Sequence, residues 1–255
     1  MQEVELPASA YRTLSPRALT PVLLTCEHAS NRLPFPGRAD GRVRGALDSH
    51  WGWDPGAMAL TREVARRLGA AAVVGRWSRL LVDLNRPVSD PTLARREAGG
   101  VELPWNRRLS PRKLESRILT YHTPYHAEID RLILRHLVRG VRPTLVAIHT
   151  FTPELNGRNR PFDAGVLFTD HAKLAYRIGK ALRTGGLRVR YNEPYSGLAG
   201  MMYSVDRHGT HHGLTNLELE FNQALFDAPR AAQRLARVTA RALVGLIDES
   251  GAAVR

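Results

Sequence analysis

The stretch VLLTCEHASN, residues 22–31, joins the pattern of a buried strand to a polar end. Its apolar and β-branched residues run directly into Glu27 and His28, and the small residues Ala29 and Ser30 follow. A short apolar run of this kind is typical of a strand that is covered on both faces of its sheet. A carboxylate and an imidazole at the end of such a strand point to function only if other strands end in the same way.

Similar apolar runs recur along the chain and alternate with helical patterns. We expect strands at 21–27, 71–77, 80–85, 144–151, 164–170, 187–194 and 216–221. We expect helices at 56–68, 111–139 with a break near Pro124, 171–184 and 228–248. Strands that alternate with helices in this manner predict an α/β fold with three layers, α/β/α.

The organisation of the chain favours one domain. Its 255 residues are enough to bury a substantial core, and they contain no internal repeat and no linker rich in proline, glycine or serine. We therefore expect a single domain over residues 1–255, with an irregular N-terminal extension over residues 1–18. Residues 88–110 show the least regular pattern, which predicts a surface excursion.

The composition of the chain disfavours proteins that bind nucleic acids or membranes. The net charge of +13 is carried mainly by arginines, which are scattered through amphipathic helical patterns and form no block. This distribution favours solvated helix faces, or an acidic substrate, over a nucleic-acid partner. Cys26 is the only cysteine, so we expect no disulfide within the chain and a cytoplasmic location. Residues 1–20 lack the apolar core that is typical of a signal peptide, and no apolar run is long enough to span a bilayer, so no membrane partner is expected.

Polar side chains stand at the carboxyl ends of several expected strands. These are Glu27 with His28, Asn85 with Arg86, His149, and Glu220. Ligands of open α/β sheets bind in the crevice outside the carboxyl ends of the strands. The sequence therefore predicts that these side chains converge on one pocket, and such a pocket indicates an enzyme.

Two of these residues predict a metal site. His28 and His149 each follow an apolar strand, and a catalytic Zn²⁺ takes three protein ligands and leaves one position open. Asp54, just before an expected helix, is our candidate for the third ligand, although a plain helix N-cap explains its spacing almost as well. Glu27 and His50 are the alternative ligands.

Other residues are candidates for handling a substrate. Arg86 offers a planar fork that matches a carboxylate, and Asn85 adds a second donor. Glu218 and Glu220 share one face of an expected strand; if that strand is central, burial is costly unless at least one acid is used or paired. A glycine-flanked segment carries three further histidines and predicts a mobile loop over the substrate: His208, His211 and His212.

Together these segments resemble the N-formylglutamate amidohydrolase family, over about residues 20–226. The matching motifs are CEHASN (26–31), HWGWDPGA (50–57), SRLLVDLNRP (78–87), YHTPYH (121–126), AIHTFTP (147–153), GRNRPFDAG (157–165), NEPYSG (192–197), RHG (207–209) and LELEFNQ (217–223). The resemblance implies a zinc-dependent amidase with a phosphorylase/hydrolase-like α/β/α sandwich around a mixed, mostly parallel sheet. It also implies a distant relation to zinc carboxypeptidases and aspartoacylases.

The resemblance implies roles for individual residues. Asn85 and Arg86 resemble the pair that holds the substrate carboxylate in aspartoacylases, His149 their second zinc ligand, and Glu220 their general base. Asn31 stands where carboxypeptidase-like sites have a glutamate ligand, which favours Asp54 as the third ligand.

The resulting hypothesis is a zinc hydrolase for the amide of an N-acyl acidic amino acid, with N-formylglutamate giving formate and glutamate. Zn²⁺ would be held by His28, Asp54 and His149, and Glu220 would move the proton. The remaining candidates are Arg79 or His208 for the oxyanion and Asn85, Arg86, Arg160 and His126 for the substrate, while Tyr125 is expected to pack. The alternatives are a zinc amidase for another N-acyl amino acid or a peptidoglycan-like amide, and a non-catalytic binder of an anion or nucleic acid.

Overall fold

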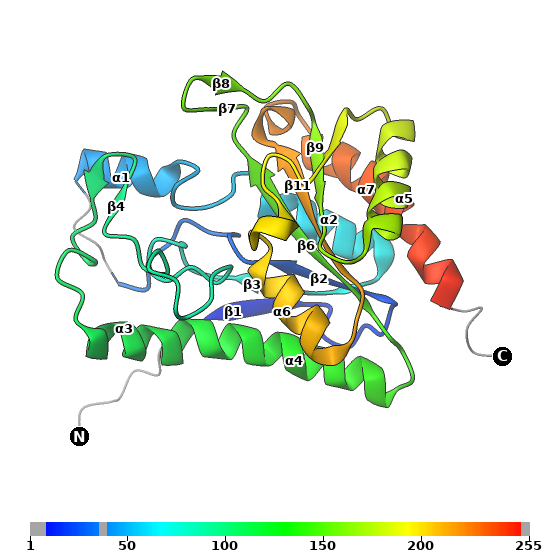
Figure 1. Cartoon of the computed structure of the whole chain (residues 1–255), viewed down its shortest axis with the longest axis horizontal. Coiled ribbons are helices and arrows are strands. Elements are labelled where there is room, and N and C mark those ends of the chain that lie inside the picture. The colour runs from blue at the N-terminus through cyan, green and yellow to red at the C-terminus, as the bar shows by residue number, and fades with distance from the viewer. Residues whose placement is uncertain (1–8, 36–39, 251–255) are drawn as a thin grey trace.

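The computed structural model describes residues 9–35 and 40–250, the last five of these by their backbone only, and its centre is a seven-stranded sheet (Figure 1). The strand order is β1-β3-β2-β6-β11-β9-β10. The strands are β1 (Tyr11–Leu14), β2 (Val22–Cys26), β3 (Ala71–Gly75), β6 (Thr144–Phe151), β9 (Ala164–Leu167), β10 (Val189–Tyr191) and β11 (Asn216–Asn222). Two small hairpins lie outside this sheet, β4 (Glu97–Ala98) with β5 (Val101–Glu102) and β7 (Glu154–Leu155) with β8 (Arg158–Asn159).

Strand directions agree with the predicted mixed, mostly parallel sheet. The four central strands β3, β2, β6 and β11 run parallel to one another. β1 and β9 pair antiparallel with their neighbours β3 and β11, and β10 runs parallel to β9. The carboxyl ends of the four central strands therefore lie along one border of the sheet.

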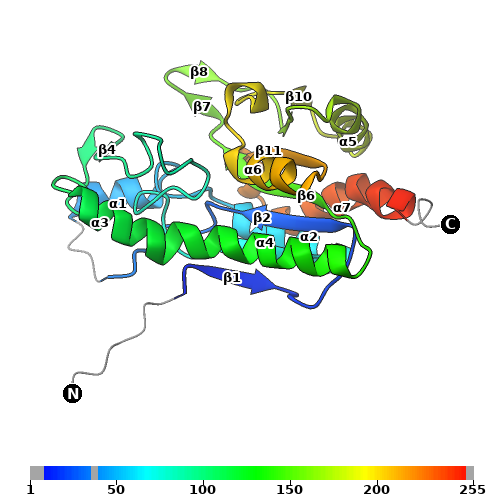
Figure 2. The ribbon, with the colours of Figure 1, turned by 60° about the horizontal axis from the view of Figure 1, so that its bottom comes forward.

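Helices cover both faces of the sheet and complete the α/β/α sandwich. They are α1 (Gly41–Asp48), α2 (Ala57–Leu68), α3 (Pro111–Arg117), α4 (Thr123–Val138), α5 (Ala172–Thr184), α6 (Tyr203–His212) and α7 (Ala231–Ser250). One core packs α2, α5 and α7 on one face, through residues such as Leu60, Ile178 and Leu235. A second core packs α4 and α6 on the opposite face, and Figure 2 shows α4 running lengthwise next to β1 and β2.

The two buried acids of β11 point to the face of the sheet opposite the apolar residues of that strand. Leu217, Leu219 and Phe221 belong to the core under α2, α5 and α7. Because successive side chains of a strand point to opposite faces, Glu218 and Glu220 point toward the face that carries α4 and α6. β11 lies between β6 and β9, so both acids sit inside the sheet and not at its edge.

One predicted strand is wrong. Residues 80–85 form turns, because partners outside the sheet satisfy their backbone groups. The Leu80 carbonyl accepts from the Asn106 side chain at 2.8 Å, and the Asn85 N–H donates to Asp83 Oδ1 at 2.9 Å. Asn106 belongs to the excursion predicted over 88–110, so that excursion holds this segment in place.

Other differences concern short elements. Residues 11–14 form the edge strand β1, so the prediction of an irregular segment over 1–18 is wrong there, while residues 1–8 lie outside the described residues. Helices α1 and α6 were not predicted from the sequence. The expected break in the helix over 111–139 is present as a π-helical turn at Ile118–His122, just before Pro124. Among the described residues, no helix has the length and apolar character that crossing a membrane requires.

The backbone around β9 is packed so closely that replacing Gly165 by alanine should lower the stability of the fold. A Cβ atom at Gly165, which lies opposite Glu220, would overlap the backbone carbonyl oxygen of Glu193. We expect Gly165→Ala to lower the free energy of unfolding by about 1–3 kcal/mol in urea denaturation. The control Gly45→Ala lies on the exposed side of α1 with open space around it, and should raise stability by about 0.5–1 kcal/mol. An equal effect of the two substitutions would contradict this account.

Candidate active site

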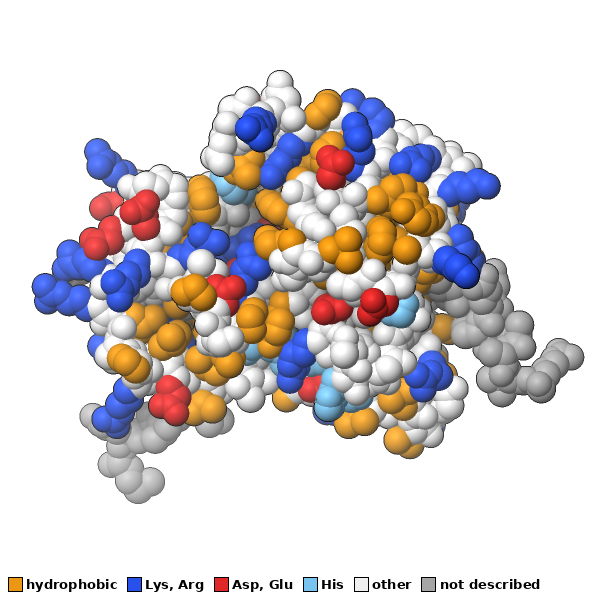
Figure 3. Space-filling model, viewed as in Figure 1, with side chains coloured by type: hydrophobic (Ala, Val, Ile, Leu, Met, Phe, Trp, Pro, Cys, Tyr) orange, Lys and Arg blue, Asp and Glu red, His pale blue; other side chains and the backbone are white. Residues whose placement is uncertain are grey.

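A pocket of about 270 Å³ opens at the carboxyl ends of the central strands. Its lining includes all three predicted metal ligands and two of the four predicted substrate-binding residues, Asn85 and Arg86. The lining residues are His28, His50, Trp51, Asp54, Arg79, Asp83, Asn85, Arg86, Arg95, His149, Thr150, Phe151, Thr152, Leu155, Tyr195, Met201, Glu218 and Glu220. Figure 3 shows one face of the molecule in space-filling form. Lys and Arg side chains lie around its outline and also near its centre.

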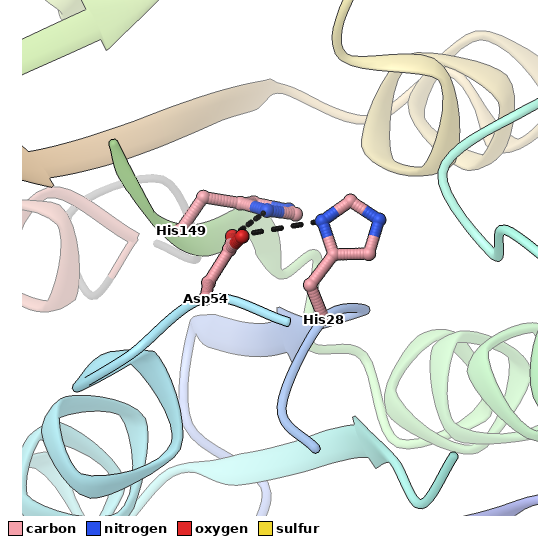
Figure 4. Close-up of side chains that lie close together, drawn as sticks. All are labelled: His28, Asp54 and His149. Carbon is pink, nitrogen blue, oxygen red and sulfur yellow. Dashed lines mark hydrogen bonds and ion pairs between the residues drawn. The ribbon is translucent and has the colours of Figure 1, made fainter. Parts of the chain in front are cut away.

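Two imidazoles meet one carboxylate in this pocket. His28 Nδ1 lies 3.5 Å and His149 Nδ1 lies 2.9 Å from the same atom, Asp54 Oδ2. Figure 4 shows the carboxylate between the two rings. All three side chains are buried, and their potential ligand atoms lie within 4.8 Å of one another. This geometry allows them to hold one metal ion.

Local backbone contacts bring these residues together. His28 follows β2 directly and His149 lies on β6, which is hydrogen-bonded to β2. The Asp54 N–H donates to the His28 carbonyl at 2.9 Å, which holds the segment before α2 against the end of β2. The Thr150 N–H also reaches Asp54 Oδ2, at 3.3 Å.

Each imidazole has a buried carboxylate on its far side. His28 Nε2 lies 2.7 Å from Asp83 Oδ1, and His149 Nε2 lies 2.9 Å from Glu27 Oε2. A carboxylate at Nε2 favours the tautomer with a proton there and leaves the Nδ1 lone pair for a metal. His28 Nδ1 is buried and has no hydrogen-bond partner. The donor set therefore fits a divalent cation at the two Nδ1 atoms and Asp54.

The pKa values follow from burial and from these partners. Burial and the charge of Arg79 lower the pKa of His28 to about 4. Burial alone would lower the pKa of His149, but the nearby charges of Glu218, Glu27 and Glu220 raise it to about 10. Burial would raise the pKa of Glu27, but the hydrogen bond with His149 lowers it to about 2. In the absence of metal, His149 is therefore an imidazolium between two carboxylates.

Glu220 lies beside this centre. Its Oε2 atom is buried without a hydrogen-bond partner, and it belongs with His149 and Glu218 to a second group of close potential ligand atoms. Burial raises its pKa to about 8, and repulsion from Glu218 acts in the same direction against the opposing charge of His149. A carboxylate with a pKa near neutrality is suited to accept and return a proton.

Cationic groups surround the acids. Arg79 forms an ion pair with the other oxygen of Asp54, and its Nε atom has no partner. The Asn85 side chain donates to Glu218 Oε2 at 3.4 Å, and Arg86 lines the pocket with its Nε atom unpartnered. The Arg160 guanidinium lies over the rings of Phe151 and Tyr195, at 5.8 and 5.2 Å, so it borders the pocket although it is outside the lining.

Two predicted site residues lie elsewhere. His126 and His208 do not line the pocket; they are buried behind it and lie 2.9 Å apart, Nδ1 to Nε2. The predicted loop over 208–212 is wrong, because these residues form the last turns of α6. His208 therefore cannot close over a substrate as a loop residue would. Tyr125 is fully buried as expected, and its hydroxyl also donates to Glu27 Oε1 at 2.8 Å.

The alternative metal ligands differ from Asp54 in position. Glu27 contacts Nε2 of His149, which is the far side of that ring. His50 lines the pocket with a buried, unpartnered Nε2, but among the described residues it joins no group of close ligand atoms.

Several pocket residues were missed by sequence reasoning. Asp83 lies two positions before Asn85, and its carboxylate in DLN was the available signal. Trp51, Arg95 and Tyr195 also line the pocket. They come from irregular segments, which no sequence periodicity connects to the ends of the strands.

The fold and the pocket define an α/β protein in which ionisable side chains gather at the carboxyl border of the sheet, where open α/β sheets bind their ligands. The sequence model of the N-formylglutamate amidohydrolase family matches residues 20–226, so the chain belongs to this family and is a hydrolase that acts on an amide C–N bond.

Solved structures show the same architecture. A gene product from Agrobacterium tumefaciens is 27% identical, with a TM-score of 0.86 and 97% of each chain covered. The N-formylglutamate amidohydrolase from Ralstonia eutropha JMP134 is 18% identical with a TM-score of 0.74, over 97% of this chain and 100% of that one, and shows the fold. Comparison with curated protein sequences gives no match.

The charge state of His149 predicts how metal binding depends on pH. Because its pKa is about 10 without metal, a metal ion at Nδ1 must displace a proton at pH 7–9. We expect the apparent affinity for Zn²⁺ to rise about tenfold per pH unit in this range. Calorimetry in buffers of different ionisation enthalpy should show release of about one proton or more. The control Asp54→Ala should weaken binding at every pH, whereas a pH-independent affinity in the unmodified protein would exclude His149 Nδ1 as a ligand.

Proposed function

We propose that this chain is a zinc-dependent amidohydrolase that cleaves the amide of an N-acyl acidic amino acid, with N-formylglutamate as the main candidate substrate. The observation that carries the proposal is the convergence of His28 Nδ1 and His149 Nδ1 on Asp54 Oδ2, inside an arginine-lined pocket with Glu220 beside it. Family membership supports the same type of reaction.

Zinc is the metal that this donor set favours, because two imidazole nitrogens and one carboxylate oxygen are typical ligands of catalytic zinc. When bound, zinc would polarise the amide carbonyl and lower the pKa of a water to about 7. Asp83 and Glu27 hold the two imidazoles in the tautomer that binds metal.

Glu220 is the proposed general base. It takes a proton from the attacking water and returns it to the leaving nitrogen, so that the amine departs neutral. Its unpartnered Oε2 is free to receive this proton, and its raised pKa matches the task. Arg79 offers an unpartnered N–H near the same centre and is the proposed donor to the negative charge that develops on the carbonyl oxygen.

The substrate class follows from the charge of the pocket. Arg79, Arg86 and Arg95 all line it, and no carboxylate of the described residues forms a close ion pair with Arg86, whose contact with Asp90 is 3.9 Å. We propose that Arg86 and Asn85 bind one substrate carboxylate, with Asn85 Nδ2 giving up its long hydrogen bond of 3.4 Å to Glu218 for this purpose. Arg160 at the border attracts the second carboxylate.

The direct test is an assay of purified, zinc-loaded protein against a panel of N-acyl amino acids. We expect hydrolysis of N-formylglutamate above that of N-acyl derivatives of neutral amino acids. Larger acyl groups in the panel distinguish formyl from other acyl specificity. No hydrolysis of any member by protein that holds zinc would contradict the proposal.

Glu220→Gln separates proton transfer from metal binding. The amide has nearly the same shape but cannot act as a base, so kcat should fall by about 10²- to 10⁴-fold. Zinc content, measured by atomic absorption, should remain that of the unmodified protein. Glu63→Gln is a control that should leave both values unchanged, because Glu63 lies on α2 outside the pocket lining and pairs only with Arg66 among the described residues. Retention of most of the turnover in Glu220→Gln would remove this residue as the base.

Arg86→Ala tests carboxylate recognition. Loss of a charge-assisted hydrogen bond costs about 1.5–3 kcal/mol, so KM for N-formylglutamate should rise about 10- to 100-fold. Arg86→Lys keeps the charge without the planar fork and should recover only part of the loss. The same KM for the dicarboxylate in all three proteins would exclude Arg86 as the carboxylate-binding residue.

A further inference from the structure

We propose that His126, held by His208 and Asp130, is a positioning residue that fixes the backbone around Asn85 and Arg86 and thereby sets affinity for the substrate carboxylate. The inference rests on the proposed function, because that function assigns carboxylate binding to these two residues. None of His126, His208 and Asp130 lines the pocket, so they act only through other groups.

Two histidines hold the backbone on either side of Asn85. His126 Nε2 lies 3.1 Å from the Leu84 carbonyl oxygen, and His122 Nε2 lies 2.9 Å from the Arg86 carbonyl oxygen. His122 precedes His126 by one helical turn, and their ring centroids are 4.4 Å apart. A segment that is a turn rather than a strand depends on such side-chain donors for its position.

The side chain of Asn85 is held as firmly as its backbone. Its Oδ1 accepts the Ser204 N–H at 2.8 Å, and its Nδ2 donates to the Met201 carbonyl at 3.3 Å. Ser204 lies in the first turn of α6, the same helix that carries His208. The N-terminal turn of α6 therefore orients Asn85 directly, through Ser204. The C-terminal part of the same helix acts on the backbone next to Asn85 indirectly, because His208 contacts His126.

The hydrogen bonds behind His126 form a chain that ends at Asp130. From the Leu84 carbonyl the chain passes through His126 and His208 to Asp130 Oδ1, which lies 2.7 Å from His208 Nδ1. Its two ends are acceptors, so His126 donates from Nε2 to the Leu84 carbonyl and His208 donates from Nδ1 to Asp130. The Arg207 guanidinium, whose Nη1 lies 3.2 Å from His208 Nε2, supplies a donor on the other side of that ring.

The neighbours of the rings show why Asp130 is needed. Burial lowers the pKa of both His126 and His208, and the charges of Arg207 and His122 act in the same direction on His126. Asp130 opposes this effect at His208, and it also accepts from His212 Nε2 at 2.8 Å. Without the carboxylate, His208 would lose the acceptor that fixes its ring, and His126, whose Nδ1 lies 2.9 Å from that ring, would lose its support behind the Leu84 carbonyl.

Asp130→Asn removes the negative charge at a partly exposed position, where the fold tolerates a change of equal size. We expect KM for N-formylglutamate to rise about tenfold, because one hydrogen bond that orders the binding segment is lost. The kcat value and the zinc content should stay close to those of the unmodified protein. His208→Asn breaks the chain at a second point and should give the same change.

A double-mutant cycle distinguishes positioning from general destabilisation. In an Arg86→Ala background, Asp130→Asn should have little further effect on KM, since the residue that it positions is already gone. His136→Gln is the matched control, because His136 is also buried on α4, but among the described residues its side chain has a hydrogen bond only to the Leu132 carbonyl of its own helix. This control should leave KM unchanged.

Hydrogen exchange of the backbone provides a readout that does not need turnover. Amides of residues 83–87 should exchange faster in Asp130→Asn than in His136→Gln, while the central strands keep their protection. If the unmodified protein hydrolyses N-formylglutamate but Asp130→Asn keeps both its KM and this protection, the inference is overturned and the proposed function stands. If the unmodified protein hydrolyses no substrate, the proposed function fails, and unchanged exchange at 83–87 separately overturns the positioning role.

Discussion

The burial of opposite charges at one border of the sheet is the constraint on which the rest of the structure depends. Two imidazole Nδ1 atoms share one oxygen of Asp54, and each ring has a further carboxylate behind it. Isolated charges would be too costly at this depth, so every member must have a partner of opposite charge or a metal. The pairing explains why the segments before α2 and after β2 pack together, and it gathers donor atoms that could hold a metal ion.

The two faces of the sheet divide structural and chemical roles. The face under α2, α5 and α7 is apolar along its length. The opposite face becomes polar toward the carboxyl ends of the strands, where Glu27, His149, Glu218 and Glu220 point toward α4 and α6. Helices on that side therefore carry polar residues of their own, such as Tyr125 and His126. The same helices therefore pack against the sheet and supply polar side chains to the groups around the pocket.

Much of the candidate site could be predicted because the short apolar runs of the strands were clear. Six of the seven expected strands exist, and those that end in His28 and His149 lie side by side, so the rule that ligands bind at carboxyl ends placed both rings. The same reasoning failed for residues 80–85, whose apolar side chains are buried although their backbone bonds lie outside the sheet. The spacing of apolar residues predicts which side chains are buried, but it does not predict which groups form hydrogen bonds with the backbone of a buried segment.

The sequence by itself determined the alternation of strands and helices, the residue types available for a metal, and the face of β11 that carries acids, because these depend on local pattern. The sequence favoured Asp54 as the third ligand and left Glu27 and His50 as alternatives, and only the tertiary structure decided which of them lies against both imidazole Nδ1 atoms. That residue is Asp54, whereas Glu27 contacts the far nitrogen of His149. The tertiary structure also decided that His126 and His208 lie behind the pocket and not in it. Such choices depend on contacts between segments far apart in the chain, and no local pattern records them.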